Sequence, residues 1–117
     1  PDGTYKTYDK RHLFCLSEEN KKLNRGEKRE IFQIKNWKIL PLICYDLRFP
    51  VWCKNKLIDN EFEYDVIINL ANWPTIRSNA WKALLEARAI ENQCYVIGLN
   101  RIGDDENEYY SGDSTCH

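Results

Sequence analysis

The 117-residue sequence contains no methionine and only two histidines, His12 and His117. Its five cysteines form no Cys-x-x-Cys pair, and with so few histidines a zinc site built from Cys and His is not expected. No apolar run approaches the roughly 18 residues needed to cross a membrane, and no signal-peptide pattern opens the sequence. The formal net charge is −1, whereas nucleic-acid binding calls for a basic patch or stripe. These absences argue against a metal, a membrane or a nucleic acid as a partner.

The composition that remains is that of one globular domain, with 43% hydrophobic and 30% charged residues. A chain of this size buries about 60–70% of its unfolded surface, which is enough for a real core. An odd number of cysteines, several of them in apolar segments, predicts free thiols and a reducing, cytoplasmic setting. A complete translation product normally begins with methionine, so we expect this sequence to be a piece of a longer protein.

The stretch that organises the chain is KILPLICYDLRFPVW, residues 38–52. Its apolar run predicts a buried strand, and the sequence turns polar directly after Cys44. Pro50 suits the first turn of a helix, because its φ is already helical and it has no N–H to satisfy. A cysteine at such a strand-to-helix elbow projects from the edge of a sheet, where backbone N–H groups can face a developing oxyanion. On its own, however, an isolated cysteine is more often a packed core residue.

The rest of the sequence alternates apolar strands with a helical segment. The predicted elements are a turn at 1–3, a short strand at 4–8, a loop with at most one helical turn at 17–29, a hairpin formed by 30–34 and the strand that begins at Trp37, a helix at 51–57, a strand at 66–71, a helix at 79–92 capped by Ser78, and a strand at 94–99. The long helix has apolar stripes on two sides, so we expect it to lie between two layers. Buried strands joined by helices predict an α/β fold with a parallel sheet and right-handed crossovers.

Polar residues follow three of these strands at Tyr45-Asp46, Asn72-Trp73 and Asn100-Arg101. Ligands of open α/β sheets bind at the carboxyl ends of the strands, so these residues are expected to share one site.

Six segments resemble the motifs of the nitrilase, or carbon–nitrogen hydrolase, superfamily and follow one another in the superfamily's order. They are YDKRHLF at 8–14, ICYDLRFP at 43–50, ANWP at 71–74, ARAIENQ at 87–93, NRIG at 100–103 and SGDS at 111–114. The sequences of the segments RFPVW and ANWP are most similar to those of the bacterial omega-amidase branch, which acts on 2-oxoglutaramate. The resemblance implies part of an α-β-β-α sandwich with buried strands and flanking helices. It also implies that residues 1–117 form the central portion of a longer carbon–nitrogen hydrolase domain.

The superfamily uses a glutamate, a lysine and a cysteine in catalysis. By this resemblance Cys44 is the nucleophile and Lys10 is the catalytic lysine. Glu19 matches a second, assisting glutamate, with Glu18 as the alternative. The general-base glutamate lies N-terminal to these motifs in the superfamily and is not in this sequence. The 117 residues alone are therefore expected to be inactive or severely impaired, and the resemblance implies no metal or organic cofactor.

The implied reaction is hydrolysis of a small carboxylate-bearing amide through a thioester, with release of ammonia. The Lys10 ammonium and the Tyr45 backbone N–H are the expected stabilisers of the oxyanion. Trp73 is expected either to wall the substrate pocket or to pack in the core. Arg77 is expected either to bind the substrate carboxylate or to be a solvated surface residue. A homodimer of the longer protein is also expected.

Other interpretations of the sequence stay open. The substrate could instead be a nitrile, an N-carbamoyl compound or deaminated glutathione, or the chain could be a non-catalytic assembly module. A papain-like protease would need His12 as the partner of Cys44, although papain-like enzymes place that histidine far downstream. Asp46 and Arg48 are expected to support the elbow, and the helical pair Arg88-Glu91 to pack and form an ion pair.

Overall fold

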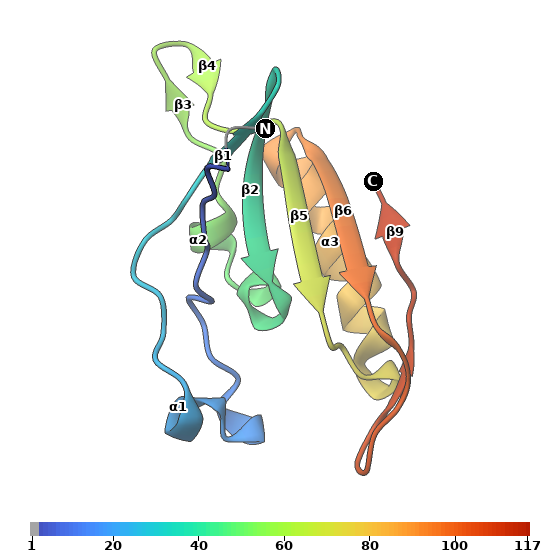
Figure 1. Ribbon diagram of the computed structural model, residues 1–117. Coiled ribbons are helices and arrows are strands. Elements are labelled where there is room, and N and C mark those ends of the chain that lie inside the picture. The colour runs from blue at the N-terminus through green and yellow to red at the C-terminus, as the bar shows by residue number, and fades with distance from the viewer. Residues whose placement is uncertain (1–2) are drawn as a thin grey trace.

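The computed structural model describes residues 3–117 and contains a five-stranded sheet with helices packed on one face (Figure 1). The strands lie in the order β1 (Phe32–Ile34), β2 (Trp37–Ile43), β5 (Val66–Ala71), β6 (Tyr95–Asn100) and β9 (Thr115–Cys116). The three central strands are parallel, whereas β1 and β9 add to the two edges in the antiparallel sense. This arrangement confirms the predicted α/β fold with a parallel central sheet.

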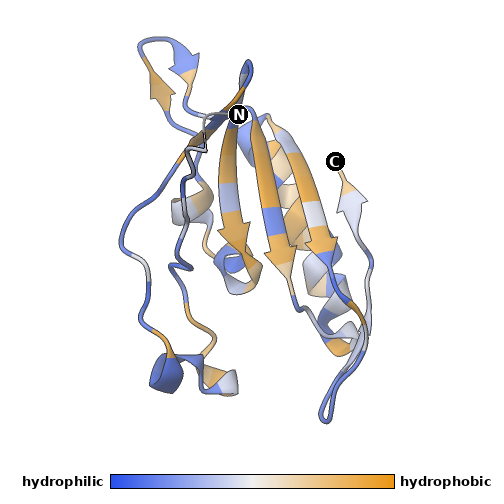
Figure 2. Ribbon diagram, in the orientation of Figure 1, coloured by the Kyte–Doolittle hydropathy of each residue, from blue (hydrophilic) through white to orange (hydrophobic). Residues whose placement is uncertain are grey.

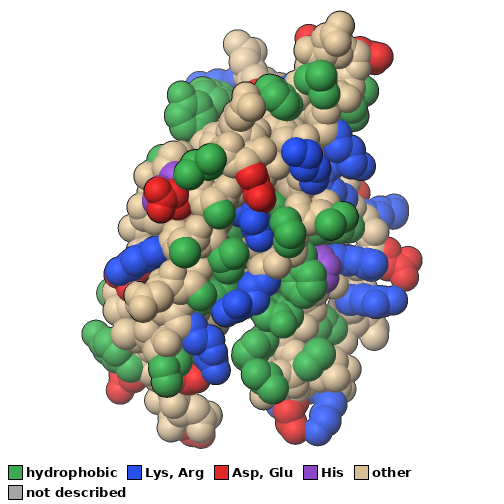
Figure 3. All heavy atoms as spheres, turned by 180° about the vertical axis from the view of Figure 1, so that it is seen from behind, with side chains coloured by type: hydrophobic (Ala, Val, Ile, Leu, Met, Phe, Trp, Pro, Cys, Tyr) green, Lys and Arg blue, Asp and Glu red, His purple; other side chains and the backbone are tan. Residues whose placement is uncertain are grey.

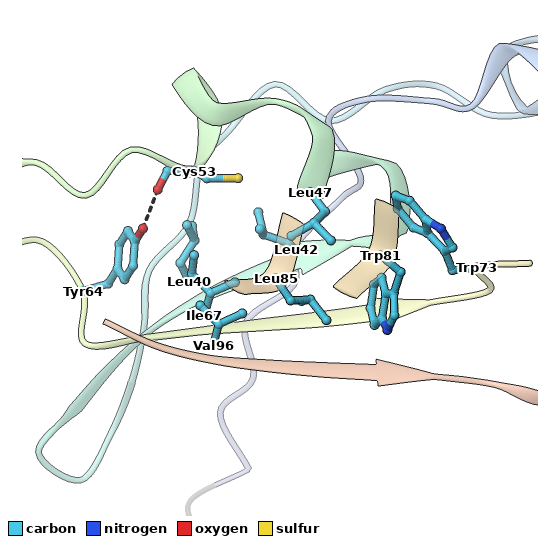
Figure 4. Close-up of a cluster of buried hydrophobic side chains, with 10 residues drawn as sticks. All are labelled: Leu40, Leu42, Leu47, Cys53, Tyr64, Ile67, Trp73, Trp81, Leu85 and Val96. Carbon is cyan, nitrogen blue, oxygen red and sulfur yellow. Dashed lines mark hydrogen bonds between the residues drawn. The ribbon is translucent and has the colours of Figure 1, made fainter. Parts of the chain in front are cut away.

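One long helix, α3 (Ser78–Asn92), covers the sheet and forms the core with it. Figure 4 shows Trp81 and Leu85 of this helix among apolar side chains from the central strands and from the segment after β2. The fully or almost fully buried members of the core are Leu40, Leu42, Leu47, Cys53, Tyr64, Ile67, Trp73, Trp81, Leu85 and Val96. The helix packs closely on β6 at Gly98, where an added Cβ would lie 2.5 Å from Leu85 Cδ1. A larger residue at this position would require the Leu85 and Trp81 side chains to move.

The opposite face of the sheet is apolar and exposed. Leu70 on β5 is 54% exposed, and Tyr95 and Leu99 on β6 are also exposed. This face is turned toward the viewer in Figure 2, where the central strands carry mostly hydrophobic colour and no helix of residues 3–117 lies in front of them.

Short elements connect the layers. They are the 3-10 helix η1 (Cys15–Ser17), α1 (Glu19–Lys22), the 3-10 helix η2 (Cys44–Arg48), α2 (Pro50–Cys53), the hairpin of β3 (Leu57–Ile58) and β4 (Glu61–Phe62), the 3-10 helix η3 (Thr75–Arg77), and the hairpin of β7 (Ile102–Asp104) and β8 (Tyr109–Ser111). The expected hairpin of β1 and β2, the short helical turn in the loop at 17–29, and the strand, elbow and helix around Cys44 are all confirmed.

Four expectations need correction. Residues 4–8 form no strand, because Tyr8 is tied by its hydroxyl group to Asp46 instead of joining a sheet. The predicted turn at 1–3 lies partly outside the described residues. The helix expected at 51–57 ends at Cys53, and residues 57–62 form the β3–β4 hairpin. Asp59 and Asn60 make this possible because both adopt positive φ, at 51° and 64°, as a tight hairpin turn requires.

The other two corrections concern α3. Ser78 is the first residue of the helix and not its cap; Arg77 occupies the cap position without a side-chain cap bond. The second apolar side of the helix is not covered by the described residues, since Ile90 is 70% exposed.

Candidate active site

Cys44 lies directly after β2, where the chain turns from the sheet into η2. Its φ is +48°, a left-handed conformation that is uncommon for any residue other than glycine. The buried side chain of Asn69, on the neighbouring strand β5, holds this turn. Its Oδ1 accepts a hydrogen bond from the Cys44 N–H at 2.9 Å, and its Nδ2 lies 3.5 Å from the Cys44 carbonyl oxygen. The nucleophile candidate is therefore fixed in a strained backbone conformation at the carboxyl edge of the sheet.

Lys10 and Glu19 form a close ion pair near this elbow. The Lys10 Nζ lies 2.6 Å from Glu19 Oε2, and the two side chains are only 11% and 29% exposed. The same carboxylate oxygen accepts the Phe14 N–H at 2.9 Å. Glu18, the alternative to Glu19, is paired with Lys21 on the exposed side of the loop. Of the two neighbouring glutamates, Glu19 is thus the one that contacts the candidate catalytic lysine.

The surroundings of Cys44 act on its thiol in opposite directions. Burial raises the pKa of the Cys44 thiol above its ordinary value, whereas the positive charge of Lys10 lowers it. The net pKa is raised, so the resting group at neutral pH is the protonated thiol. A base is needed to remove this proton when the sulfur attacks.

The candidate residues border a hollow of about 1030 Å³. Lys10, Glu19, Cys44 and Arg77 line it together with the ends of β5 and β6. Figure 3 shows the molecule from behind, and its lower edge is hollowed between the lobe that carries α1 and the lobe that carries the β7–β8 hairpin. The hollow is large enough for a small substrate, and its lining includes Leu70 and Leu99 of the exposed sheet face.

A second cavity of about 40 Å³ lies beside Cys44 and is lined by the other proposed binding residues, Tyr45, Trp73 and Arg77, together with Arg48. The Tyr45 ring packs edge-on against Phe14 at 5.1 Å between ring centroids. Arg77 also reaches the large hollow, where its Nη1 lies 3.4 Å from Glu108 Oε1.

Trp73 packs in the core, as one of its two predicted roles requires, and it also borders the small cavity. It is 4% exposed and lies against Trp81, with the two ring centroids 5.4 Å apart. Its indole N–H donates to the Arg77 carbonyl oxygen at 2.8 Å. The Arg48 guanidinium stacks over its ring at 4.9 Å.

Within residues 3–117, no cluster of three or more His, Cys, Asp and Glu side chains is arranged to hold a metal ion. In the same part of the chain, no helix is long and apolar enough to cross a membrane.

The sequence matches the carbon-nitrogen hydrolase family over residues 1–117. The chain belongs to this family. It is 50% identical over 115 residues to the omega-amidase YafV of Yersinia enterocolitica, an alignment that covers 97% of this chain and 43% of the relative. It is 39% identical over 109 residues to a 2-oxoglutaramate amidase of Bacillus subtilis, covering 93% of this chain and 41% of the relative.

A solved structure agrees with this family membership. A CN-hydrolase superfamily protein from Xanthomonas campestris, with an arsenic adduct in its active site, superposes with a TM-score of 0.94 at 45% identity. The superposition covers 99% of this chain and 45% of that chain. The chain therefore spans less than half the length of the relatives that it matches.

Several residues that shape the site of this carbon–nitrogen hydrolase chain were not among the sequence predictions. Asn69 is one, although a lone polar residue in the apolar run at 66–71 was a usable signal. Asn100 was noted only as a polar residue after a strand. Its side chain accepts the Trp73 N–H at 2.7 Å and donates to the Trp73 carbonyl oxygen at 2.9 Å. Glu108 is another: it reaches the hollow from the β7–β8 hairpin.

Proposed function

We propose that this chain carries the nucleophile and the charged pair of a thiol-dependent amidohydrolase. The enzyme would cleave a non-peptide C–N bond of a small amide and release ammonia. The observation that carries the proposal is the placement of Cys44, Lys10 and Glu19 around one hollow at the carboxyl edge of the sheet. Membership of the carbon–nitrogen hydrolase family supports the same reaction class.

The chemistry follows from the residue types. A base takes the Cys44 proton, the sulfur forms a bond to the amide carbonyl carbon, and the carbonyl oxygen becomes an oxyanion. The Lys10 ammonium, held in place by Glu19, and the Tyr45 backbone N–H stabilise that charge. One such donor is worth on the order of 10²–10³ in rate. The intermediate collapses as the C–N bond breaks, and the nitrogen accepts a proton and leaves as ammonia.

Water then completes the reaction. It attacks the thioester carbonyl carbon and gives up a proton to the base. The C–S bond then breaks, the carboxylic acid product is released, and the proton on the base restores the Cys44 thiol. The base in this proposal is a glutamate outside residues 1–117, as the family resemblance implies. Without it, the 117 residues are expected to be inactive or severely impaired.

The proposed substrate is a small amide that also carries a carboxylate, similar to 2-oxoglutaramate. The names of the matched omega-amidase and 2-oxoglutaramate amidase support this choice. Arg77 is the proposed partner of the carboxylate, because its guanidinium borders both cavities near Cys44. Trp73 and Tyr45 would form the apolar wall beside it. No cofactor is needed for this reaction.

The proposal extends to the longer protein, called the full-length protein below. Residues 1–117 would be the central portion of its carbon–nitrogen hydrolase domain, in line with the partial coverage of the relatives. The exposed apolar face of the sheet would then be covered by the second sheet of an α-β-β-α sandwich. We further propose a cytoplasmic location, because the five cysteines are free thiols of the kind that a reducing compartment preserves. The proposed oligomeric state of the full-length protein is a homodimer.

The test is ammonia release from 2-oxoglutaramate by the full-length protein, by its Cys44→Ala variant and by its Lys10→Met variant. We expect no release after Cys44→Ala and a rate lower by about 10²–10³ after Lys10→Met. Ammonia release that persists in Cys44→Ala would refute the proposed nucleophile.

Two alternatives have distinct outcomes in this test. No release, with Cys44 still readily alkylated, would point to another amide, a nitrile or an N-carbamoyl compound. No release and an inert Cys44 would favour a non-catalytic assembly module. The papain-like alternative is disfavoured, because the His12 ring is stacked on Phe49 and its Nδ1 lies 2.9 Å from Asp46 Oδ1.

A further inference from the structure

Asp46 is a fully buried carboxylate two residues after the nucleophile candidate. A buried charge is costly unless hydrogen-bond donors surround it. Here four donors converge on it: the Tyr8 hydroxyl group at 2.8 Å, the His12 backbone N–H and ring Nδ1, each at 2.9 Å, and the Ile43 N–H at 3.1 Å. The ring bond requires the His12 proton on Nδ1 whenever Asp46 is ionised. The carboxylate is thus well satisfied, although it lines neither cavity beside Cys44.

The positions of these donors in the sequence show what Asp46 connects. Tyr8 and His12 lie two residues before and two residues after Lys10. Ile43 lies directly before Cys44. One carboxylate therefore binds both sides of the lysine and the backbone that leads into the cysteine. These two segments come from separate parts of the chain.

Further contacts join the same two segments. The Tyr8 hydroxyl group also accepts the Trp52 indole N–H at 3.0 Å, and the His12 ring lies parallel to Phe49 with the centroids 3.6 Å apart. Trp52 and Phe49 both follow the elbow, so the lysine loop is attached to the elbow at several points. Glu19 fixes the Lys10 ammonium directly, whereas Asp46 fixes the backbone that carries Lys10.

We propose that Asp46 is a positioning residue: through Tyr8 and His12 it sets the placement of the Lys10 ammonium relative to the Cys44 thiol. The inference rests on the proposed function only for the roles of Lys10 and Cys44. Its effect is on geometry and local charge, and Asp46 itself touches no reacting atom.

The test compares two alkylating reagents on Cys44 in the full-length protein, with peptide mapping to separate this thiol from the other cysteines. Iodoacetate is anionic and iodoacetamide is neutral, so the ratio of their rates reports the positive charge near the sulfur. We expect Lys10→Met to lower this ratio about three- to tenfold at low ionic strength. Asp46→Asn should lower it by a similar factor, because the amide keeps only one acceptor oxygen and turns an NH₂ group toward the two donors that the other oxygen accepted.

The double variant separates positioning from general damage. In the Lys10→Met background, Asp46→Asn should no longer lower the ratio, because no ammonium remains to be displaced; loss of the Asp46 charge, which also acts on Cys44, can only raise it. An equal further fall in that background would overturn the proposal, and so would an unchanged ratio in Asp46→Asn alone. Since the reagents measure the thiol and not turnover, this result stands whether or not 2-oxoglutaramate is the substrate.

Milder variants keep the test decisive if Asp46→Asn does not fold. Tyr8→Phe removes one donor and should lower the ratio by a smaller factor. Tyr64→Phe is its control, because Tyr64 is a fully buried tyrosine whose hydroxyl group donates to the Cys53 carbonyl oxygen in the core, whereas the half-buried Tyr8 donates to Asp46. An equal effect of the two substitutions would overturn the proposal. His12→Asn, which can retain a side-chain N–H near Nδ1, should preserve the ratio better than His12→Ala; equal losses would contradict the role of this bond.

Discussion

Asn69 offers a direct test of whether the strained elbow is needed for catalysis. Asn69→Leu keeps the approximate side-chain volume but removes the oxygen that accepts the Cys44 N–H at 2.9 Å. Leaving a buried N–H without a partner costs about 1–3 kcal/mol of folding stability. The bond from Asn69 Nδ2 is long, at 3.5 Å, and adds little to this figure.

The effect on rate follows from the backbone strain. Holding a residue other than glycine at positive φ, as Cys44 is held at +48°, costs on the order of 1–3 kcal/mol. If one to two of those kcal/mol are released when the elbow relaxes, the fraction of molecules with Cys44 in its present position falls about five- to thirtyfold. We expect kcat for amide hydrolysis by the full-length protein to fall by that factor.

Asn92→Leu is the matched control. Asn92 is also a buried asparagine, and its Oδ1 accepts the Asn55 N–H at 2.9 Å, but it lies at the other end of the sheet. Urea denaturation should show a similar stability loss for both variants, whereas only Asn69→Leu should lower kcat. Equal losses of kcat, or an Asn69→Leu enzyme with unchanged kcat, would refute the argument that Asn69 holds the reactive geometry.

Three further predictions concern close packing and alkaline pH. Gly26→Ala would place a Cβ 2.2 Å from the Asp9 carbonyl oxygen, so it should displace the loop that carries Lys10, the proposed catalytic lysine, and lower kcat; unchanged kinetics would contradict this. Gly98→Ala should lower the free energy of unfolding, measured by urea denaturation, by about 1–3 kcal/mol. The loss should be smaller in a Leu85→Ala background, because the Leu85 side chain lies nearest to the new Cβ; equal losses in both backgrounds would contradict the packing argument. Burial raises the pKa of Cys53 from 9.0 to about 11. The unfolded chain therefore loses this proton before the folded protein does, and the free energy of unfolding should fall as the pH rises from 9 to 11. Cys53→Ala should make that fall shallower, and an identical slope in both proteins would refute the assignment.

Strong local patterns made the central part of the fold predictable. The apolar runs of β2, β5 and β6 are long enough to identify buried strands, and Pro50 marks the start of α2. The small hairpins were not predictable in the same way. The β3–β4 turn uses left-handed φ at Asp59 and Asn60 without a glycine, so its sequence resembles an ordinary polar break.

The site was predictable in outline and not in contact detail. Polar residues after parallel strands were expected to share one site. Of these, Asn72, Asn100 and Arg101 line the hollow, Tyr45 and Trp73 line the small cavity beside it, and Asp46 lines neither. The expected support of the elbow by Asp46 is likewise confirmed by its hydrogen bonds. The contacts that distinguish Glu19 from Glu18 could not be predicted from the sequence, because these neighbouring side chains point to different partners, Lys10 and Lys21.

Short and long polar side chains have different roles in the site. Asp46, Asn69 and Asn100 each bind backbone groups of another segment, and short side chains of this kind lose little conformational entropy when they are fixed. Lys10 and Arg77 instead reach the hollow with long, flexible side chains. The charged end of Lys10 is paired with Glu19, and that of Arg77 with Glu108. Substitution of Asp46, Asn69 or Asn100 should consequently displace the reacting groups and lower kcat for every substrate alike. Substitution of Arg77 should change which substrates bind, because only a carboxylate-bearing amide would make use of its charge.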